Sequence, residues 1–382
     1  MILEFSLKGF CSFKEKETLY LVPEKGARLK GTHYESNFIL NSSYRPMKSA
    51  IIFGANASGK TNIILGLERL IAILKNGLNI ANEFDYKLLN HQSPAIEFEI
   101  LLLDSEMKNT FKYRVRYNEK ELLEEALFYN DIKVFQFKDE SFTIKSMERQ
   151  SQLEEVFSNR STETHIKKLN DYKIYEIEEF KKLIGKIAIS RESVFNLEAK
   201  EMVSQIGEEG KAFFEKNRER VISLLAMFDK SIEELDFKKN QMSDTHYILS
   251  LKRYGYDTLF PLSQESDGIK KIVNLMHSLL KITEGWTIAI DELDSSISTY
   301  SLIKLFNMFV NVEENKIGQL IVTSHNALLF NNNIFSPQQI FIVDKNEELT
   351  SEIHSLSEFN VRSEKENIFL DFLKGRFGGI NG

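Results

Sequence analysis

The residues best suited to chemistry form a glycine-rich loop, Gly54-Ala-Asn-Ala-Ser-Gly-Lys-Thr61, with the spacing G-x-x-x-x-G-K-[ST]. Glycines let such a loop fold around an anion with its backbone N–H groups pointing inward. A lysine and a hydroxyl at its end can reach the β- and γ-phosphates of a nucleotide and ligate Mg²⁺. The pattern predicts a nucleotide site, with Lys60 also catalytic and Thr61 a magnesium ligand. Its binding residues are Gly54, Asn56, Ser58, Gly59, Lys60, Thr61 and Asn62.

The flanking sequence supplies the elements that position this loop. An apolar run precedes it at 50–53, and an amphipathic stretch follows with apolar residues at Ile63, Ile64, Leu67, Leu70, Ile71 and Leu74. The N-terminus of a helix there would favour a bound anion through its dipole. Strand, loop and helix in this order favour a phosphate-binding loop over a chance glycine turn.

A second set of acidic residues follows another apolar run, at 286–290. A carboxylate at the end of such a strand can hold Mg²⁺, and Asp291 fits this role. Glu292 would then orient or deprotonate the attacking water. The pair predicts the catalytic half of a nucleotide site.

Two further segments extend this constellation. Thr323-Ser-His325 follows the next apolar strand, which would place a catalytic His325 beside the γ-phosphate. Ser266 and Gly268 precede an amphipathic helix at 269–282. They form either a second anion site at that helix N-terminus or an ordinary helix cap.

The patterns divide the chain into three parts. Alternating apolar residues predict strands in 1–146, including an antiparallel meander from about 96 to 142. The charged segment 147–235 favours helices, and we expect an insertion that is either a lid on the core or an arm that contacts a partner. Strands alternate with helices in 236–382, which predicts a parallel α/β sheet.

Composition limits the classes of protein. The chain has 382 residues with 42% apolar and 27% charged residues, as soluble globular proteins do. One cysteine excludes an internal disulfide, and no run of 18 apolar residues or secretion signal is present, so we expect a cytoplasmic protein. The net charge of −7 disfavours nucleic acid over the whole surface, although the clusters at 167–168 and 238–239 could be local contacts or solvated surface.

Taken together, these motifs resemble the ABC-type ATPases of the SMC/RecF/OLD branch. The order is the phosphate loop, Glu-Ser-Asp-Gly268, Ile-Asp-Glu-Leu-Asp294 and Thr-Ser-His325. The segments at 339–345, 355–359 and 369–379 are more similar to stand-alone ATPases of abortive-infection and other phage-defence systems, such as the ATPase subunit of the PARIS system. The resemblance implies a P-loop ABC-ATPase head with an antiparallel β meander and a helical insertion.

The resemblance also assigns roles. Ser266 and Gly268 would act as the ABC signature that closes over the ATP of a second copy, Asp294 as the D-loop residue and His325 as the switch histidine. His91 and Gln92 are candidates for the Q-loop. The implied function is an ATP- and Mg²⁺-dependent homo-oligomeric switch that senses infection, through a phage-encoded trigger, and controls a separate effector such as a nuclease.

Three other functions stay open. A RecF- or SMC-like DNA-maintenance ATPase would need a basic groove across the dimer. A transporter's nucleotide-binding subunit would need a membrane partner, and a scaffold would bind nucleotide without turnover. The segment that follows His325 is too short for the nuclease domain of OLD-type relatives, which favours a separately encoded effector.

Overall fold

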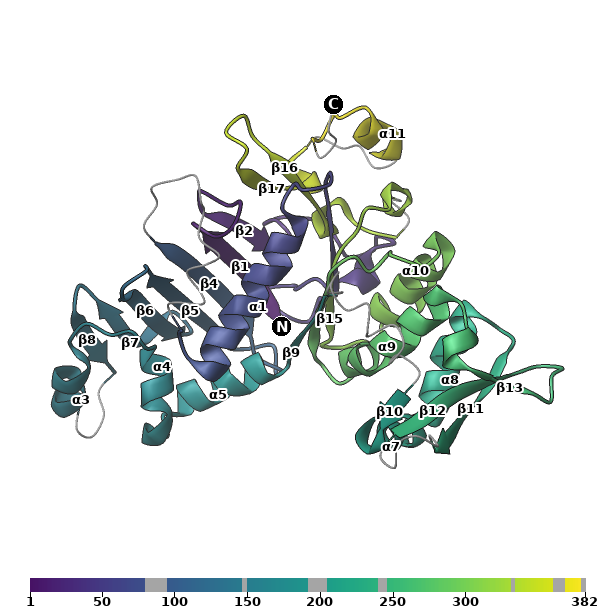
Figure 1. The fold of residues 1–382 in the computed structure, drawn as a ribbon. Helices are drawn as coiled ribbons and strands as arrows, with labels where there is room; N and C mark the ends of the chain where they lie inside the picture. Colours follow the sequence, from purple (N-terminus) through teal and green to yellow (C-terminus); the bar gives the residue numbers. More distant parts are fainter. Residues whose placement is uncertain are drawn as a thin grey trace.

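The computed structural model describes residues 1–79, 95–145, 150–191, 205–239, 246–330, 334–359 and 368–378. At its centre is a six-stranded sheet in the order β17-β16-β3-β15-β14-β9 (Figure 1). Every neighbouring pair is parallel except the hairpin of β16 and β17. The parallel α/β sheet is thus confirmed, with strands β3 (Ser49–Phe53), β9 (Ile187–Ser190), β14 (Thr287–Ile290), β15 (Gln319–Thr323), β16 (Ile340–Lys345) and β17 (Ser351–Ser355).

Strand β3 shows why the inner strands of this sheet are mostly apolar. Its alternating side chains enter two different cores: Ala50 and Ile52 pack on the side of helix α1 (Lys60–Asn76), while Ile51 and Phe53 pack on the side of helix α9 (Asp267–Ile282). An inner strand of a sheet that is covered on both faces buries side chains on both sides, and all five residues of β3 are buried. The phosphate loop leaves this sheet at the carboxyl end of β3.

A seven-stranded antiparallel sheet lies on the other side of α1 (Figure 1). It contains the predicted meander, and the N-terminal strands β1 and β2 join it in the order β2-β1-β4-β5-β6-β7-β8. Its strands are β1 (Ile2–Lys8), β2 (Glu17–Tyr20), β4 (Ile96–Leu103), β5 (Thr110–Tyr117), β6 (Leu122–Tyr129), β7 (Ile132–Lys138) and β8 (Ser141–Ile144). Helix α1 is therefore packed between two sheets, which fixes the direction of its N-terminus.

The segment expected to be helical between 147 and 235 has a more mixed structure. Its helices are α3 (Gln150–Phe157), α4 (His165–Lys168), α5 (Tyr175–Gly185), α7 (Glu208–Lys216) and α8 (Arg218–Phe228). The same segment also supplies β9 to the central sheet. The expected helical character was wrong for residues 187–190, because this short apolar run pairs with β14, a strand far along the chain.

A third, smaller sheet joins the end of this segment to the strands between residues 246 and 261. Strands β10 (Gln205–Gly207) and β11 (Ile232–Lys239) pair with opposite edges of β12 (His246–Arg253), and β13 (Leu259–Pro261) also pairs with β12. Helix α8 packs against β11 and α9. This sheet leads directly into the Ser266 segment.

The remaining elements complete the second core. Helix α10 (Thr299–Leu305) continues into a π-helical turn, η5 (Phe306–Val310). A short helix, α11 (Ile368–Leu373), lies near the C-terminus (Figure 1). None of the described helices has the length and apolar character needed to span a membrane.

Candidate nucleotide-binding site

The loop between β3 and α1 has the backbone shape that its glycines predict. Gly54 and Gly59 have φ angles of 155° and 115°, and Ala57 also lies in the left-handed region, with φ 61°. A Cβ on Gly54 would collide with the Val343 carbonyl, and one on Gly59 would collide with the Ser351 hydroxyl. Both positions therefore require glycine for conformation and for space.

Lys60 lies over the centre of this loop. Its Nζ donates hydrogen bonds to the Gly54 and Ala55 carbonyls, both at 2.8 Å. Burial lowers the pKa of the ammonium to about 8, although the nearby Glu292 and Asp291 act to raise that pKa. The ammonium is thus held beside the loop whose backbone N–H groups would contact the phosphate oxygens.

Thr61 and Asp291 come together as the sequence predicted. The Thr61 hydroxyl donates to Asp291 Oδ1 at 3.3 Å, although the two residues lie in distant parts of the chain. A hydroxyl and a carboxylate are hard oxygen ligands, which Mg²⁺ prefers. Ser58 Oγ is buried without a hydrogen-bond partner among the described residues, so the loop also holds a polar atom free for a ligand. These residues fit a nucleotide phosphate with its Mg²⁺.

Glu292 and His325 face each other at the ends of β14 and β15. His325 Nε2 lies 3.6 Å from Glu292 Oε1, and both side chains are partly exposed. Glu292 adopts φ 50°, a left-handed conformation that is uncommon for a residue with a side chain. Asp294 lies in the same cluster, since its Oδ2 accepts a hydrogen bond from the His325 N–H at 3.0 Å. The structure therefore brings together the predicted base, histidine and D-loop residue.

The Ser266 segment lies apart from the phosphate loop of the same chain. Ser266 is the N-cap of α9 and accepts a hydrogen bond from the Ile269 N–H at 3.4 Å. A hollow of about 470 Å³ opens in front of it, lined in part by Asp229, Gly268 and Ser298 and by no residue of the phosphate loop. Within the described chain, the two candidate anion-binding segments thus occupy separate surfaces.

Several residues that support the site were not predicted. The Thr323 hydroxyl donates to Asp291 Oδ1 at 2.5 Å and accepts from the Glu292 N–H at 2.7 Å. The Ser351 hydroxyl donates to the Ser58 carbonyl at 2.5 Å. Thr323 could have been found from its place beside His325, whereas Ser351 lies in no motif.

Two other residues predicted to bind the nucleotide, Asn62 and Asn56, lie at the edge of the phosphate loop. The Asn62 amide donates to the Ser12 hydroxyl at 2.9 Å, on the side of the loop that Ser351 also contacts. Asn56 is exposed at the tip of the loop. His91 and Gln92, the Q-loop candidates, lie outside the described residues.

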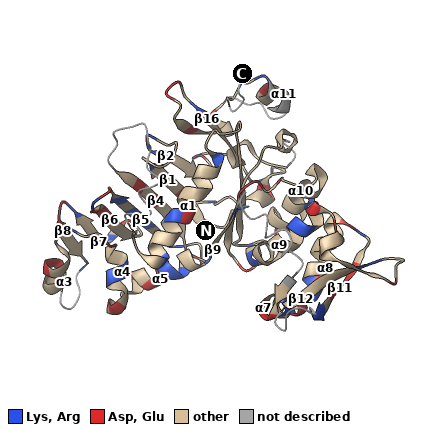
Figure 2. Cartoon of the chain, viewed as in Figure 1, with Lys and Arg blue, Asp and Glu red and all other residues tan. Residues whose placement is uncertain are grey.

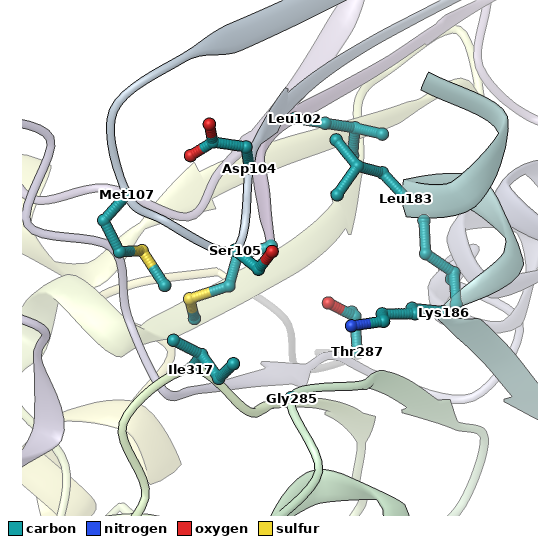
Figure 3. Close-up of a pocket in the computed structure, with 11 residues that line it drawn as sticks. Leu102, Asp104, Ser105, Met107, Leu183, Lys186, Gly285, Thr287 and Ile317 are labelled. Atoms are coloured by element: carbon teal, nitrogen blue, oxygen red, sulfur yellow. The ribbon is translucent and has the colours of Figure 1, made fainter. Parts of the chain in front are cut away.

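A separate small cavity lies where the two large sheets meet, and it is not the nucleotide site. Figure 3 shows it between Asp104, Lys186 and Thr287, with Met107 and Ile317 at its rim. Its volume of about 20 Å³ is that of a single water molecule. A nucleotide could not enter it.

The two lysines at 167–168 form an ion pair and hydrogen bonds with neighbouring groups of the protein. Lys167 pairs with Glu163 at 2.7 Å and also donates to the Asn76 carbonyl, and Lys168 donates to the Ser161 hydroxyl. Acidic and basic residues are mixed over α4 and α5 (Figure 2). These contacts favour an ordinary solvated surface at this cluster.

Comparisons with known proteins identify a family and a fold. Residues 49–331 match the profile of a family described as "AAA domain, putative AbiEii toxin, Type IV TA system". No curated protein matches the chain. Among solved structures, an SMC head bound to the C-winged helix domain of ScpA is 15% identical, with a TM-score of 0.50 over 92% of this chain and 96% of that one.

Two further SMC heads are similar at lower TM-scores. One from Thermotoga maritima is 14% identical, with a TM-score of 0.47 over 93% of this chain and 98% of the other. One with an extended coiled coil, bound to the C-terminal domain of ScpA derived from Pyrococcus furiosus, is 14% identical, with a TM-score of 0.48 over 94% and 97%. The fold of this chain is that of an SMC-type ATPase head.

Proposed function

This chain belongs to the family of AAA-domain proteins whose description names an AbiEii toxin of a type IV toxin–antitoxin system, and we propose that it binds and hydrolyses ATP between two copies of itself. The observation that carries the proposal is the convergence of Thr61, Asp291, Glu292 and His325 at the carboxyl ends of neighbouring parallel strands. Such ends are where α/β sheets bind ligands.

Each residue would contribute a separate function to hydrolysis. The loop N–H groups and Lys60 would hold the β- and γ-phosphates, and Thr61 and Asp291 would hold the Mg²⁺. A bound Mg²⁺ supplies positive charge that neutralises the phosphate oxygens. Glu292 would accept a proton from the attacking water, and His325, 3.6 Å away, would help to orient it.

The second copy would complete the site with its Ser266–Gly268 segment. In support, this segment opens onto a hollow that contains no residue of its own phosphate loop. The N-terminus of α9 would stabilise the γ-phosphate of the partner's ATP through its helix dipole and its free N–H donors. ATP would therefore join the two copies, and hydrolysis would release them.

The biological role we propose is a switch in anti-phage defence of the abortive-infection type. The family description and the sequence resemblance to phage-defence ATPases both support this setting. The chain would respond to a phage-encoded trigger and control a separate toxic effector, such as a nuclease. If the purified chain alone cut DNA or RNA in the presence of Mg²⁺, the proposal of a separate effector would fall.

The test of the ATPase proposal compares the wild-type chain with Glu292→Gln. We expect Mg²⁺-dependent release of phosphate from ATP by the wild type, and a loss of about a hundredfold or more in the variant. Light scattering should show an ATP-dependent dimer that persists longer in Glu292→Gln. Unchanged hydrolysis in the variant would exclude Glu292 as the base. Tight, salt-sensitive, ATP-dependent DNA binding would instead favour a DNA-maintenance ATPase.

A further inference from the structure

Helix α9 carries a buried lysine, Lys271, whose ammonium contacts the turn that contains Glu292. Lys271 is only 7% exposed, and its Nζ donates a hydrogen bond to the Glu292 carbonyl at 2.6 Å. The same ammonium also donates to the Ser295 hydroxyl. A buried ammonium is tolerated only when its N–H groups are satisfied, so these contacts fix Lys271 to the turn that follows β14.

This turn is fixed from two sides. The Glu292 N–H is bound by the Thr323 hydroxyl at 2.7 Å, and the Glu292 carbonyl is bound by Lys271 at 2.6 Å. Glu292 itself has φ 50°, a left-handed conformation that is unfavourable for a residue other than glycine. Two hydrogen bonds thus maintain a strained backbone that directs the Glu292 side chain toward His325.

The first turn of α9 also contacts the turn that follows β14 directly. A Cβ on Gly268 would lie 2.6 Å from the Ser296 carbonyl oxygen, so the first turn of α9 is packed against the residues that follow Asp294. Ser266, Gly268 and Ser296 all line the hollow in front of α9. A displacement of the N-terminus of α9 therefore acts on the Glu292 turn through Lys271 and through this backbone contact.

We propose that Lys271 is a positioning residue that couples the Ser266 end of α9 to the orientation of Glu292 in the same chain. The inference rests on the proposed function, in which α9 binds the partner's nucleotide while Glu292 acts on the chain's own. Phosphate bound at α9 would then set the geometry of the base at the other site. The two sites of a dimer would hydrolyse ATP cooperatively because each chain carries this link.

The test uses Lys271→Met, Lys271→Arg and, as a matched control at the far end of α9, Lys281→Met. We expect Lys271→Met to lower kcat by about tenfold to a hundredfold, because small misplacements of a catalytic group have effects of that size. The Kd for ATP should stay within about threefold, and the Hill coefficient should fall toward 1. Lys271→Arg should recover most of kcat, and Lys281→Met should match the wild type.

Other outcomes separate this inference from the proposed function. If Glu292→Gln abolishes hydrolysis while Lys271→Met keeps the wild-type kcat and Hill coefficient, the coupling is wrong and the ATPase proposal stands. If Glu292→Gln hydrolyses ATP at the wild-type rate, the assignment of Glu292 as the base is wrong, and the coupling proposal falls with it. A parallel loss of kcat and ATP binding in Lys271→Met, with a lowered Tm, would show a merely structural role. Should Lys271→Met not fold, Ser295→Ala must still reduce kcat at unchanged Kd, or the proposal is overturned.

Discussion

The Thr323 hydroxyl donates a hydrogen bond to Asp291 Oδ1 at 2.5 Å and is also bound by the Glu292 N–H. Thr323 ends β15, and Asp291 directly follows β14, so the parallel register of these two strands sets the contact. One side chain therefore orients both the expected metal ligand and the expected base. The proposed catalytic half of the site therefore depends on sheet register as well as on its motif.

Replacing Thr323 with valine tests this relationship. Valine has nearly the same shape but leaves the Glu292 N–H without its partner, which costs about 1–3 kcal/mol of unfolding free energy. We expect kcat to fall about tenfold to a hundredfold, since both carboxylates lose their orientation. Thr323→Ser keeps the hydroxyl and should remain close to wild type. Chemical denaturation and steady-state phosphate release measure the two effects, and an active Thr323→Val would contradict the assignment.

Asp291→Asn should weaken the response to Mg²⁺. The substitution removes one negative charge from the oxygen pair made with Thr61, 3.3 Å away. We expect the Mg²⁺ concentration for half-maximal hydrolysis to rise by about tenfold or more, and chelation of Mg²⁺ to abolish hydrolysis in the wild type. Asp131→Asn, on the exposed β6–β7 hairpin, is the matched control. An identical Mg²⁺ response in Asp291→Asn and wild type would remove Asp291 from the metal site.

Lys60 should couple nucleotide binding to proton uptake. Burial lowers the pKa of its ammonium to about 8, and bound phosphate would raise this pKa again. At pH 7 the ammonium is already charged, so binding takes up few protons. At about pH 8.5 it is mostly neutral, so binding takes up most of one proton. Calorimetric titrations in two buffers with different ionisation enthalpies measure this uptake.

The lowered pKa of Lys60 also determines whether the free energy of unfolding rises or falls with pH. An unfolded lysine has a pKa of about 10.4, so between about pH 8 and pH 10.4 the unfolded chain binds more protons than the folded one. The contribution of Lys60 to the free energy of unfolding therefore rises with pH across this window. Lys60→Arg stays charged throughout and should lose both effects. Equal proton uptake at pH 7 and pH 8.5 in the wild type would contradict the lowered pKa.

The parts of the site that could be predicted are those with local signals. The phosphate loop follows a short apolar strand and begins a 17-residue helix, as its sequence indicates. Asp291 and Glu292 likewise follow a fully buried strand, β14. Here neighbouring residues alone determine the element, so pattern and structure agree.

The parts that could not be predicted depend on distant partners. Strand β9 looked like part of a charged helical segment, yet β14 makes it a strand of the central sheet. Glu125 is fully buried in β6 because Tyr113 and the Ile166 N–H donate to it at 2.8 and 3.0 Å. Neither contact has a sequence pattern, since the compensating groups come from another strand and a later helix.

Ser351 gives the last prediction, because it holds the phosphate loop from the C-terminal hairpin. Its hydroxyl donates to the Ser58 carbonyl and lies 2.7 Å from Ser12 Oγ, which in turn accepts from the Asn62 amide. Ser351→Ala would release the loop while leaving β14 and β15 intact. We expect ATP affinity to fall several-fold, by the roughly 0.5–1.5 kcal/mol of one hydrogen bond, with kcat at saturation unchanged.

Ser357→Ala is the matched control, since its hydroxyl binds Glu24 near the surface, away from the loop. Equilibrium binding of a fluorescent ATP analogue measures affinity, and phosphate release at saturating ATP measures kcat. If Ser351→Ala lowered kcat as strongly as Thr323→Val, the hairpin would act on the catalytic carboxylates. An affinity loss alone would restrict its action to the phosphate loop, as the separate hydrogen-bond networks of Ser351 and Thr323 require.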